Sequence, residues 1–299
     1  MEPLEAAYTV HQRLHETDPA LFTRMAPRIR AIAASGDSKV GTELIAQLPA
    51  LEIISVMGVG YDGIDVAAAK ARGVVVTHTP GVLNDDVADL AIGLMLAWAR
   101  QLPRADRYVR CGDWARGPLP LGRKVSGARL GLVGMGRIGQ AIAHRAAAFG
   151  MSIAYTARSV RADVPYRHLP TAAALAAQSD FLVVITPGGA ATRKLIDAQV
   201  LAALGPQGCL VNVARGSVVD EAALIAALQA GTLGGAALDV FENEPAVPQA
   251  LRELDNVVLT PHIGSATAQT RRAMAELAFA NLDAGLNGRA LLTPVPECR

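Results

Sequence analysis

One stretch of the sequence, residues 129–159, constrains the fold more than any other. A short apolar run that is typical of a buried strand leads into three glycines with the spacing G-x-G-x-x-G. An Ala-rich helical pattern follows from Arg137 to Phe149, Gly150 is placed to end it as a C-cap, and a second strand begins at Ile153. Glycine spacing alone is a weak signal. Strand, glycine turn, helix and strand in this order predict a dinucleotide-binding unit.

Each of the three glycines has its own physical role in such a unit. Gly134 permits a tight turn, Gly136 leaves room for a pyrophosphate, and Gly139 lets the helix pack close to the strand. The N–H groups at the helix start then face the phosphates, where the helix dipole also favours negative charge. The alternative is a glycine-rich turn in an unrelated α/β protein, which the flanking strand and helix patterns disfavour.

The end of the second strand predicts which dinucleotide binds. A site that prefers NAD places Asp or Glu about twenty residues after the glycines, against the ribose 2′-OH. Here that place holds Ala157, and Arg158 and Ser159 follow. A guanidinium and a hydroxyl can bind a 2′-phosphate, and no carboxylate repels it. We therefore expect NADP(H), with NADH as the weaker alternative; in the other interpretation Arg158 is an ordinary exposed residue.

Composition excludes several classes of function. The chain has 299 residues, a formal net charge of +1 and three cysteines far apart in sequence. The near-neutral charge disfavours nucleic acid or membrane as a partner, and no apolar run is long enough for a membrane span. Cys111, Cys209 and Cys298 fit neither a disulfide framework nor a zinc spacing, so we expect no metal and a cytoplasmic protein.

Alternating strand and helix patterns predict an α/β protein with two Rossmann-like or flavodoxin-like parallel-sheet domains and a cleft between them. We expect a substrate-binding domain from residues 1–98 plus 269–299, and a dinucleotide-binding domain from residues 99–268. Expected strands are 6–11, 30–34, 53–57, 74–77, 130–133, 153–155, 181–185, 209–213, 235–238 and 257–259. Expected helices are 19–29, 42–48, 85–100 (with Asn84 as N-cap), 137–149 and 268–286, and residues 104–124 are expected to be irregular.

Three charged residues, Arg215, Glu244 and His262, follow predicted strands of the second domain. Strand ends of a parallel sheet meet at one edge, so these side chains can share a site. Arg215 can bind a carboxylate and polarise the adjacent carbonyl, His262 can protonate the carbonyl oxygen, and Glu244 can raise the pKa of that histidine. These residue types suit the reduction of a 2-oxo acid.

Each of these residues also has a structural interpretation when it is taken alone. A single histidine after a strand is more often structural, an arginine at a helix start can bind a loop carbonyl, and Glu244 precedes Pro245 as many surface-turn residues do. Their joint placement after three strands favours the catalytic interpretation.

At these residues the sequence resembles the D-2-hydroxyacid dehydrogenase family, most of all its NADPH-dependent glyoxylate/hydroxypyruvate reductases, including the plant hydroxyphenylpyruvate reductases. The resemblance covers nearly the whole chain. The matching segments are VGYDGID (59–65), TPGVLNDDVADLAIGLML (79–96), GLVGMGRIG (131–139), NVARGSVVDEAAL (212–224), GGAALDVFENEP (234–245) and LTPHIGSAT (259–267).

The resemblance implies a role for each matching residue. Arg215 binds the substrate, Glu244 is the partner acid and His262 is the proton donor, while the backbone N–H groups of Val59 and Gly60 bind the substrate carboxylate. Asp239 matches the residue that holds the nicotinamide carboxamide. The implied cofactor contacts are Gly134, Met135, Gly136, Arg137, Ile138, Gly139, Ala157, Arg158, Ser159, Thr186, Pro187, Val213, Ala214, Asp239 and Gly264.

We therefore expect an enzyme that reduces small 2-oxo acids, glyoxylate and hydroxypyruvate first, to D-2-hydroxy acids with NADPH. One alternative is a hydroxyphenylpyruvate-type reductase with a larger pocket, on which Trp114 and Met57 bear. Another is a non-catalytic dinucleotide sensor like the corepressors that share this fold. The acidic partner excludes a close formate dehydrogenase, for which the resemblance implies Gln. The resemblance also implies a homodimer that forms through the dinucleotide-binding domain, with residues 100–125 reaching the partner. One departure is that the chain starts close to the first helix, without the family's usual opening strand and turn.

Overall fold

The computed structural model describes residues 2–299, which form two compact units. The first unit comprises residues 2–83 together with Ala268–Arg299, and the second comprises Asn84–Thr267. Each unit is built around a parallel β-sheet, as expected for an α/β protein. None of the helices in residues 2–299 combines the length and hydrophobicity that a membrane span requires.

The first unit contains a three-stranded sheet in the order β1-β2-β3. Its strands are β1 (Ala31–Ser35), β2 (Ile53–Met57) and β3 (Val75–Thr77). Its helices are α1 (Glu2–Ala7), α2 (Leu14–Thr17), α3 (Pro19–Met25), α4 (Thr42–Ala46), α5 (Val66–Ala71) and α13 (Ala268–Leu286), with 3-10 turns η1 (Ala26–Arg28) and η5 (Pro296–Cys298). The strand expected at residues 6–11 is wrong, because residues 2–7 form α1 and no strand follows before β1.

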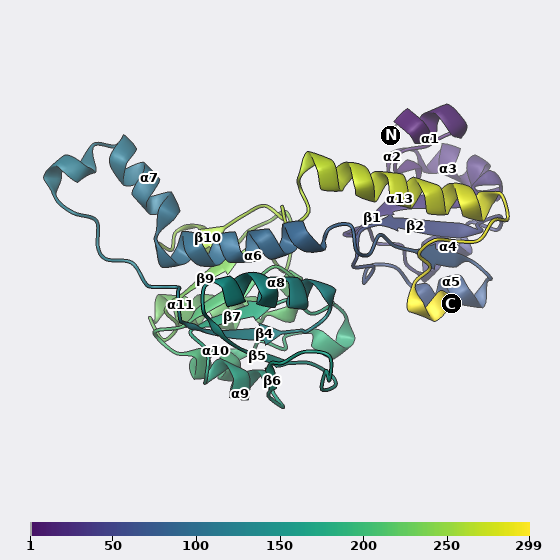
Figure 1. Cartoon of the computed structure of the whole chain (residues 1–299). Helices are drawn as coiled ribbons and strands as arrows, with labels where there is room; N and C mark the ends of the chain where they lie inside the picture. The colour runs from purple at the N-terminus through teal and green to yellow at the C-terminus, as the bar shows by residue number, and fades with distance from the viewer. Residues whose placement is uncertain (1) are drawn as a thin grey trace. The chain divides into compact units, whose positions relative to one another are not determined.

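The C-terminal helix α13 packs along this sheet although it is more than 200 residues away in sequence (Figure 1). The Ser55 hydroxyl on β2 donates to the Ala278 carbonyl at 2.8 Å. Gly285 allows close approach, since a Cβ there would lie 2.6 Å from Ile53 Cδ1. The bounds of α13 and β2 confirm the predicted ones.

The second unit contains a seven-stranded parallel sheet in the order β10-β9-β8-β7-β4-β5-β6. Its strands are β4 (Arg129–Val133), β5 (Ser152–Thr156), β6 (Arg167–His168), β7 (Phe181–Val184), β8 (Cys209–Asn212), β9 (Gly235–Leu238) and β10 (Val257–Leu259). Its helices are α6 (Asn84–Ala99), α7 (Leu102–Arg110), α8 (Arg137–Ala148), α9 (Ala172–Ala176), α10 (Ala198–Leu204), α11 (Glu221–Gln229) and α12 (Gln249–Arg252), with 3-10 turns η2 (Asp113–Arg116), η3 (Ala190–Thr192) and η4 (Gly216–Val218).

Helices cover both faces of the larger sheet, with α6 and α8 on one side and α9 and α10 on the other (Figure 1). The central strands β7, β8 and β9 are therefore buried along their whole length, and β4 is buried after its first residue; their buried residues are mostly apolar. Strand order reverses at β4, because the chain first continues to β5 and β6 and then returns to β7 on the other side. Such a switch point is where open parallel sheets bind ligands.

Three local predictions need correction. The expected division after residue 98 placed α6 with the first domain, whereas α6 belongs to the second unit because it packs against α8 and β9. The segment expected to be irregular contains α7 and η2. Asn84, expected as the N-cap, is itself the first residue of α6. The helix after the glycine turn is as predicted, and Gly150 ends it with φ at +64°.

Candidate active site and dinucleotide site

The loops that follow the strands of the second unit lie along one edge in the order of the sheet. His262, Glu244 and Arg215 follow β10, β9 and β8, which are neighbours. Thr186, the glycine turn and residues 157–159 follow β7, β4 and β5, which continue the same sheet. Because every pair is parallel, one half of the edge carries the candidate catalytic residues and the other half carries the candidate dinucleotide residues.

His262 and Glu244 form a hydrogen-bonded pair. The distance from His262 Nδ1 to Glu244 Oε2 is 2.7 Å. The other carboxylate oxygen of Glu244 accepts the Phe241 N–H at 2.9 Å, which fixes the carboxylate on the loop after β9. With Nδ1 engaged in this way, Nε2 is the ring nitrogen that can exchange a proton with a substrate.

Electrostatics favours the charged form of both partners. The hydrogen bond that His262 donates to the Glu244 carboxylate raises the pKa of His262 above its ordinary value, although burial and the Arg215 charge oppose this. Burial alone would raise the pKa of Glu244, but the hydrogen bonds from His262 and the Phe241 N–H hold it below its usual value. The positive charge of Arg215 lowers the pKa of both Glu244 and His262, so its charge influences the protonation of both partners.

Arg215 is presented by a loop that the buried Asn212 organises. The Asn212 side chain donates to the Arg215 carbonyl and accepts the Ala214 N–H, each at 3.0 Å. The next residue, Gly216, packs directly on the loop after β9, since a Cβ there would lie 1.9 Å from the Phe241 carbonyl carbon. This close approach brings the loop that carries Arg215 against the loop that carries Glu244.

The backbone of His262 adopts a left-handed conformation with φ at +52°, which is uncommon for a residue other than glycine. The buried Asp239 holds this turn. Its carboxylate accepts the Thr260 hydroxyl at 2.7 Å and the N–H groups of Ile263 and Gly264 at 2.8 Å each. Its carbonyl accepts the His262 N–H at 2.8 Å. Burial raises the pKa of Asp239, and these hydrogen bonds oppose the rise.

In the glycine turn, two of the three glycines allow close approaches between backbone segments, and the third leaves open space. Gly134 has φ at +115°, and a Cβ there would lie 2.5 Å from the Ile185 carbonyl oxygen. A Cβ at Gly139 would lie 2.4 Å from the Gly134 carbonyl oxygen, so the helix can approach only because this residue is glycine. At Gly136, a Cβ would meet no atom within 4 Å. Open space therefore lies beside the first turn of α8, where Met135 is buried and Arg137 and Ile138 are not.

The residues at the end of β5 are available to a ligand. Arg158 and Ser159 are exposed, and within residues 2–299 no ion pair engages the Arg158 guanidinium. The neighbouring Arg161 differs, because its guanidinium is paired with Asp163, with Nε 2.8 Å from Oδ1. The Ala157 carbonyl lies 3.3 Å from His168 Nε2.

The other predicted contact residues lie further along the same edge or in the first unit. Thr186 and Pro187 follow β7, and the Pro187 carbonyl accepts the Thr192 hydroxyl at 2.7 Å. Val213 and Ala214 are buried. Val59 and Gly60 follow β2 of the first unit. In the described part of the chain, no group of three or more His, Cys, Asp or Glu side chains could hold a metal ion.

Comparison with known proteins places this geometry in a family. Residues 92–264 match the family described as D-isomer specific 2-hydroxyacid dehydrogenase, NAD binding domain. A glyoxylate/hydroxypyruvate reductase A from Arabidopsis thaliana is 52% identical over 267 residues, which cover 89% of this chain and 85% of that protein. The chain belongs to the D-isomer specific 2-hydroxyacid dehydrogenases. It is therefore an oxidoreductase, and its second unit contains the NAD-binding domain of the family.

Two further members of the family are similar over most of their length. A hydroxyphenylpyruvate reductase from Plectranthus scutellarioides is 49% identical, over 93% of this chain and 90% of that protein. The solved structure of an NADPH-dependent glyoxylate/hydroxypyruvate reductase from Sinorhizobium meliloti, in complex with NADP and malonate, is 50% identical. It superimposes with a TM-score of 0.90 over 94% of this chain and 88% of that one.

In this dehydrogenase, the structure also gives Asp239 a role that the sequence did not reveal. The resemblance implied only a contact with the nicotinamide, whereas both carboxylate oxygens hold the turn that carries His262. Of the three groups that donate to the Asp239 carboxylate, only the Thr260 hydroxyl is a side chain that the sequence shows; the other two are backbone N–H groups.

Proposed function

We propose that this protein reduces small 2-oxo acids, glyoxylate and hydroxypyruvate foremost, to D-2-hydroxy acids with NADPH. The observation that carries the proposal is the 2.7 Å hydrogen bond between His262 Nδ1 and Glu244, with the Arg215 charge acting on both. The relatives named glyoxylate/hydroxypyruvate reductases support the choice of substrate.

The residues divide the work of the reaction between them. Arg215 binds the substrate carboxylate and polarises the adjacent carbonyl with its planar N–H donors. His262, as the imidazolium that Glu244 stabilises, donates the Nε2 proton to the carbonyl oxygen. The bound dinucleotide supplies the hydride that reaches the carbonyl carbon. In the oxidative direction the neutral His262 accepts the proton from the alcohol.

The dinucleotide is NADPH in this proposal because of the end of β5. Ala157 stands where an NAD-preferring site has a carboxylate, and the exposed Arg158 and Ser159 provide donors for a 2′-phosphate. The Sinorhizobium meliloti relative, whose structure contains NADP, supports this preference. Arg158→Ala should raise KM for NADPH and leave KM for NADH unchanged. Equal use of NADH and NADPH by the wild type would refute the preference.

The direct test is oxidation of NADPH, followed by absorbance, with glyoxylate or hydroxypyruvate as substrate. We expect turnover by the wild type and a large fall in kcat in His262→Ala. His144→Ala, which removes a histidine on α8 rather than at the sheet edge, is the matched control. Near-normal turnover in His262→Ala would refute the assigned proton donor.

Hydroxyphenylpyruvate is the second candidate substrate, because the Plectranthus scutellarioides relative, at 49% identity, is almost as similar as the Arabidopsis thaliana glyoxylate/hydroxypyruvate reductase A at 52%. A substrate panel that compares kcat/KM for glyoxylate, hydroxypyruvate and hydroxyphenylpyruvate separates the two. Tight NADPH binding without turnover of any 2-oxo acid would instead favour a dinucleotide sensor.

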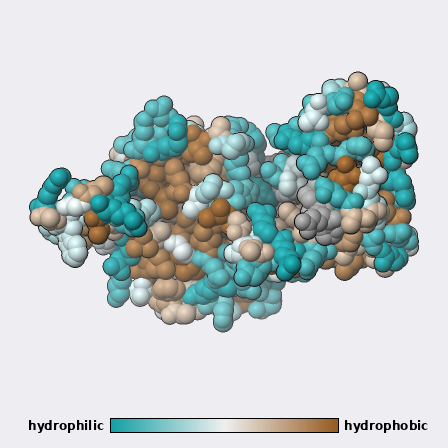
Figure 2. Space-filling model, turned by 90° about the horizontal axis from the view of Figure 1, so that it is seen from above, coloured by the Kyte–Doolittle hydropathy of each residue, from teal (hydrophilic) through white to brown (hydrophobic). Residues whose placement is uncertain are grey.

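We also propose a homodimer formed through the second unit. Helix α7 and the turn η2 project from the body of that unit (Figure 1) and carry large apolar side chains in the open: Trp114 is 70% exposed, and Leu121, which follows the turn, is 97% exposed. Figure 2 shows a broad hydrophobic surface on the same unit beside this projection. Exposed apolar area of this kind is typical of a protein–protein interface.

A further inference from the structure

Two loops at the carboxyl edge of the first sheet are hydrogen-bonded to each other. One follows β2 and contains Gly58, Val59 and Gly60, and the other follows the neighbouring strand β3 and contains His78 and Thr79. The Thr79 N–H donates to the Gly58 carbonyl at 2.8 Å. His78 Nδ1 lies 3.0 Å from the Val59 carbonyl oxygen, and since a carbonyl can only accept, Nδ1 carries the proton.

These two hydrogen bonds determine where the next N–H groups point. In a trans peptide the N–H points away from the preceding carbonyl, and the peptides from Gly58 to Gly60 are trans. Holding the Gly58 and Val59 carbonyls on the side of His78 therefore turns the Val59 and Gly60 N–H groups to the opposite side. Within residues 2–299 neither of these N–H groups donates to another group.

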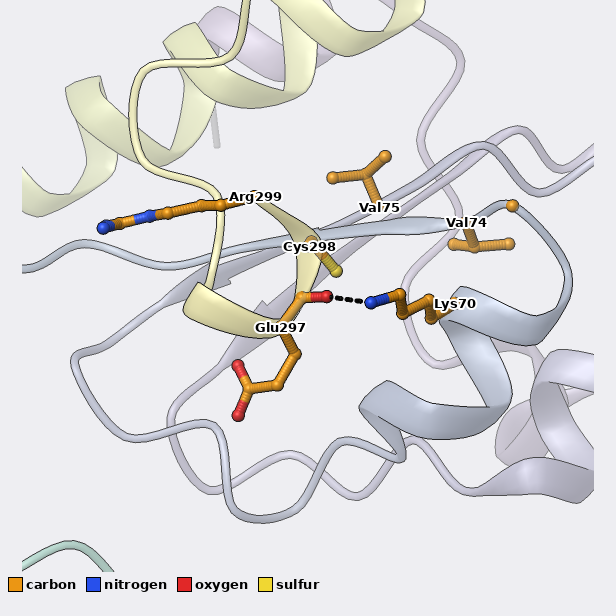
Figure 3. A pocket seen from close by; sticks show the side chains of 7 residues that line it. Lys70, Val74, Val75, Glu297, Cys298 and Arg299 are labelled. Atoms are coloured by element: carbon orange, nitrogen blue, oxygen red, sulfur yellow. Dashed lines mark hydrogen bonds between the residues drawn. The ribbon is translucent and has the colours of Figure 1, made fainter.

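His78 is itself held firmly. It is 9% exposed, and its ring lies edge-on to Tyr61 with centroids 5.3 Å apart. Its N–H donates to the Thr293 carbonyl at 3.1 Å, and the Thr293 hydroxyl donates to the His78 carbonyl at 2.5 Å. The Tyr61 hydroxyl donates to the Glu297 carboxylate at 3.1 Å. The Lys70 ammonium donates to the Glu297 carbonyl at 2.7 Å, on the side away from that carboxylate (Figure 3). Tyr61 and Lys70 thus both hold the 3-10 turn η5, which contains Glu297.

We propose that His78 is a positioning residue for substrate binding. Its Nδ1–H donates to the Val59 carbonyl and so presents the Val59 and Gly60 N–H groups as a preformed pair of donors for the substrate carboxylate. The inference rests on the proposed function and on the carboxylate contact that the family resemblance implies for those two N–H groups, beside Arg215. His78 acts only through the loop and does not touch the reacting atoms. Loss of the hydrogen bond should therefore weaken substrate binding more than it slows the chemical step.

A matched pair of variants isolates the donor at Nδ1. In His78→Asn the side-chain Nδ2 can occupy the place of Nδ1, whereas His78→Leu has nearly the same shape as Asn without a donor. For His78→Leu we expect roughly tenfold increases in KM for glyoxylate and in Kd for oxalate, the latter measured with the enzyme–NADP⁺ complex. The kcat should stay within about twofold, and NADPH binding should be unchanged because it depends on the second unit. His78→Asn should remain within about threefold of the wild type in all four measurements.

The outcomes separate this inference from the proposed function. Wild-type KM and oxalate binding in His78→Leu, or equal impairment of the Leu and Asn variants, would overturn the positioning role. If His78→Leu does not fold, His78→Gln, whose amide reaches the place of Nε2 instead of Nδ1, replaces it with the same expectation. A wild-type protein that neither reduces a 2-oxo acid nor binds oxalate would refute the proposed function, and this inference with it. That failure would be visible before any variant is made.

Discussion

Replacing Glu244 with Gln removes the negative charge beside His262 and keeps one acceptor oxygen, which can face Nδ1 while the amide NH₂ faces the Phe241 N–H. Two opposite charges about 4 Å apart attract by roughly 1 kcal/mol in water and about 4 kcal/mol at an effective dielectric of 20. The side chains of His262 and Glu244 are 40% and 28% exposed, so solvent screening places the value toward the lower end. Loss of about 2 kcal/mol of attraction would reduce the preference for the imidazolium form by more than tenfold, and so lower the pKa of His262.

The sign of the effect follows from the direction of the reaction. In the proposed reduction His262 must be protonated, so the rate falls as the pH rises through its pKa. In the wild type Glu244 raises that pKa. The Glu244→Gln variant should therefore lose activity at a lower pH than the wild type, with the alkaline limb of the kcat/KM profile for glyoxylate displaced to lower pH.

A control variant should carry the same change in charge away from the site. Asp180→Asn removes a carboxylate whose Oδ1 lies 2.7 Å from the Arg129 guanidinium, next to the amino end of β7 and so at the opposite edge of the sheet. Its alkaline limb should coincide with that of the wild type. An unmoved alkaline limb in Glu244→Gln, even with reduced activity, would show that Glu244 does not tune His262 electrostatically and would refute the reasoning.

Three further predictions test the cofactor turn, the His262 turn and the interface. Gly139→Ala should lower Tm and abolish dinucleotide binding, because the new Cβ would lie 2.4 Å from the Gly134 carbonyl oxygen. Gly136→Ala should fold normally and lose only NADPH affinity. Thermal unfolding measures Tm for both variants, and fluorescence titration measures their NADPH affinity. Asp239→Asn should cost about 1–3 kcal/mol of stability in denaturant unfolding, because the amide NH₂ would face a buried N–H donor, and wild-type stability would contradict the role given to Asp239. Trp114→Glu should shift the protein from dimer to monomer in light scattering, and a monomeric wild type would contradict the interface.

The strands and the glycine turn could be predicted from the sequence because their signals are local. The bounds of β2, β9 and β10 follow from apolar runs between turn residues, and the structure confirms them. Helix α7 was not predicted because it has only nine residues, four of them charged, and Pro103 stands at its start; in the structure none of its residues is buried. Strand β6 is only two residues long at the sheet edge, which is too short for any period to show.

The contacts that shape the candidate site were less accessible to sequence reasoning. Parallel strand ends predicted that Arg215, Glu244 and His262 would share an edge, and the structure places them after three adjacent strands. The left-handed backbone at His262 and the three donors around Asp239 depend on how two loops pack in register. The alignment of these two loops is set by the pairing of β9 with β10, in which Leu259 lies beside Leu238. This pairing joins residues far apart in sequence, so no local residue pattern predicts it.

The position of β9 in the sheet explains why one carboxylate can support the turn and another can support the imidazole. β9 lies between β8 and β10, so the segment that follows it reaches both neighbours. Asp239 comes first after the strand and binds the backbone of the loop after β10, and Glu244, five residues later, binds the ring of His262 on that same loop. The histidine is thus fixed at its backbone and at Nδ1 by one segment, which leaves Nε2 as its only free atom for proton transfer. A change in the length of the segment between Asp239 and Glu244 should therefore impair proton transfer even if every charged residue is kept.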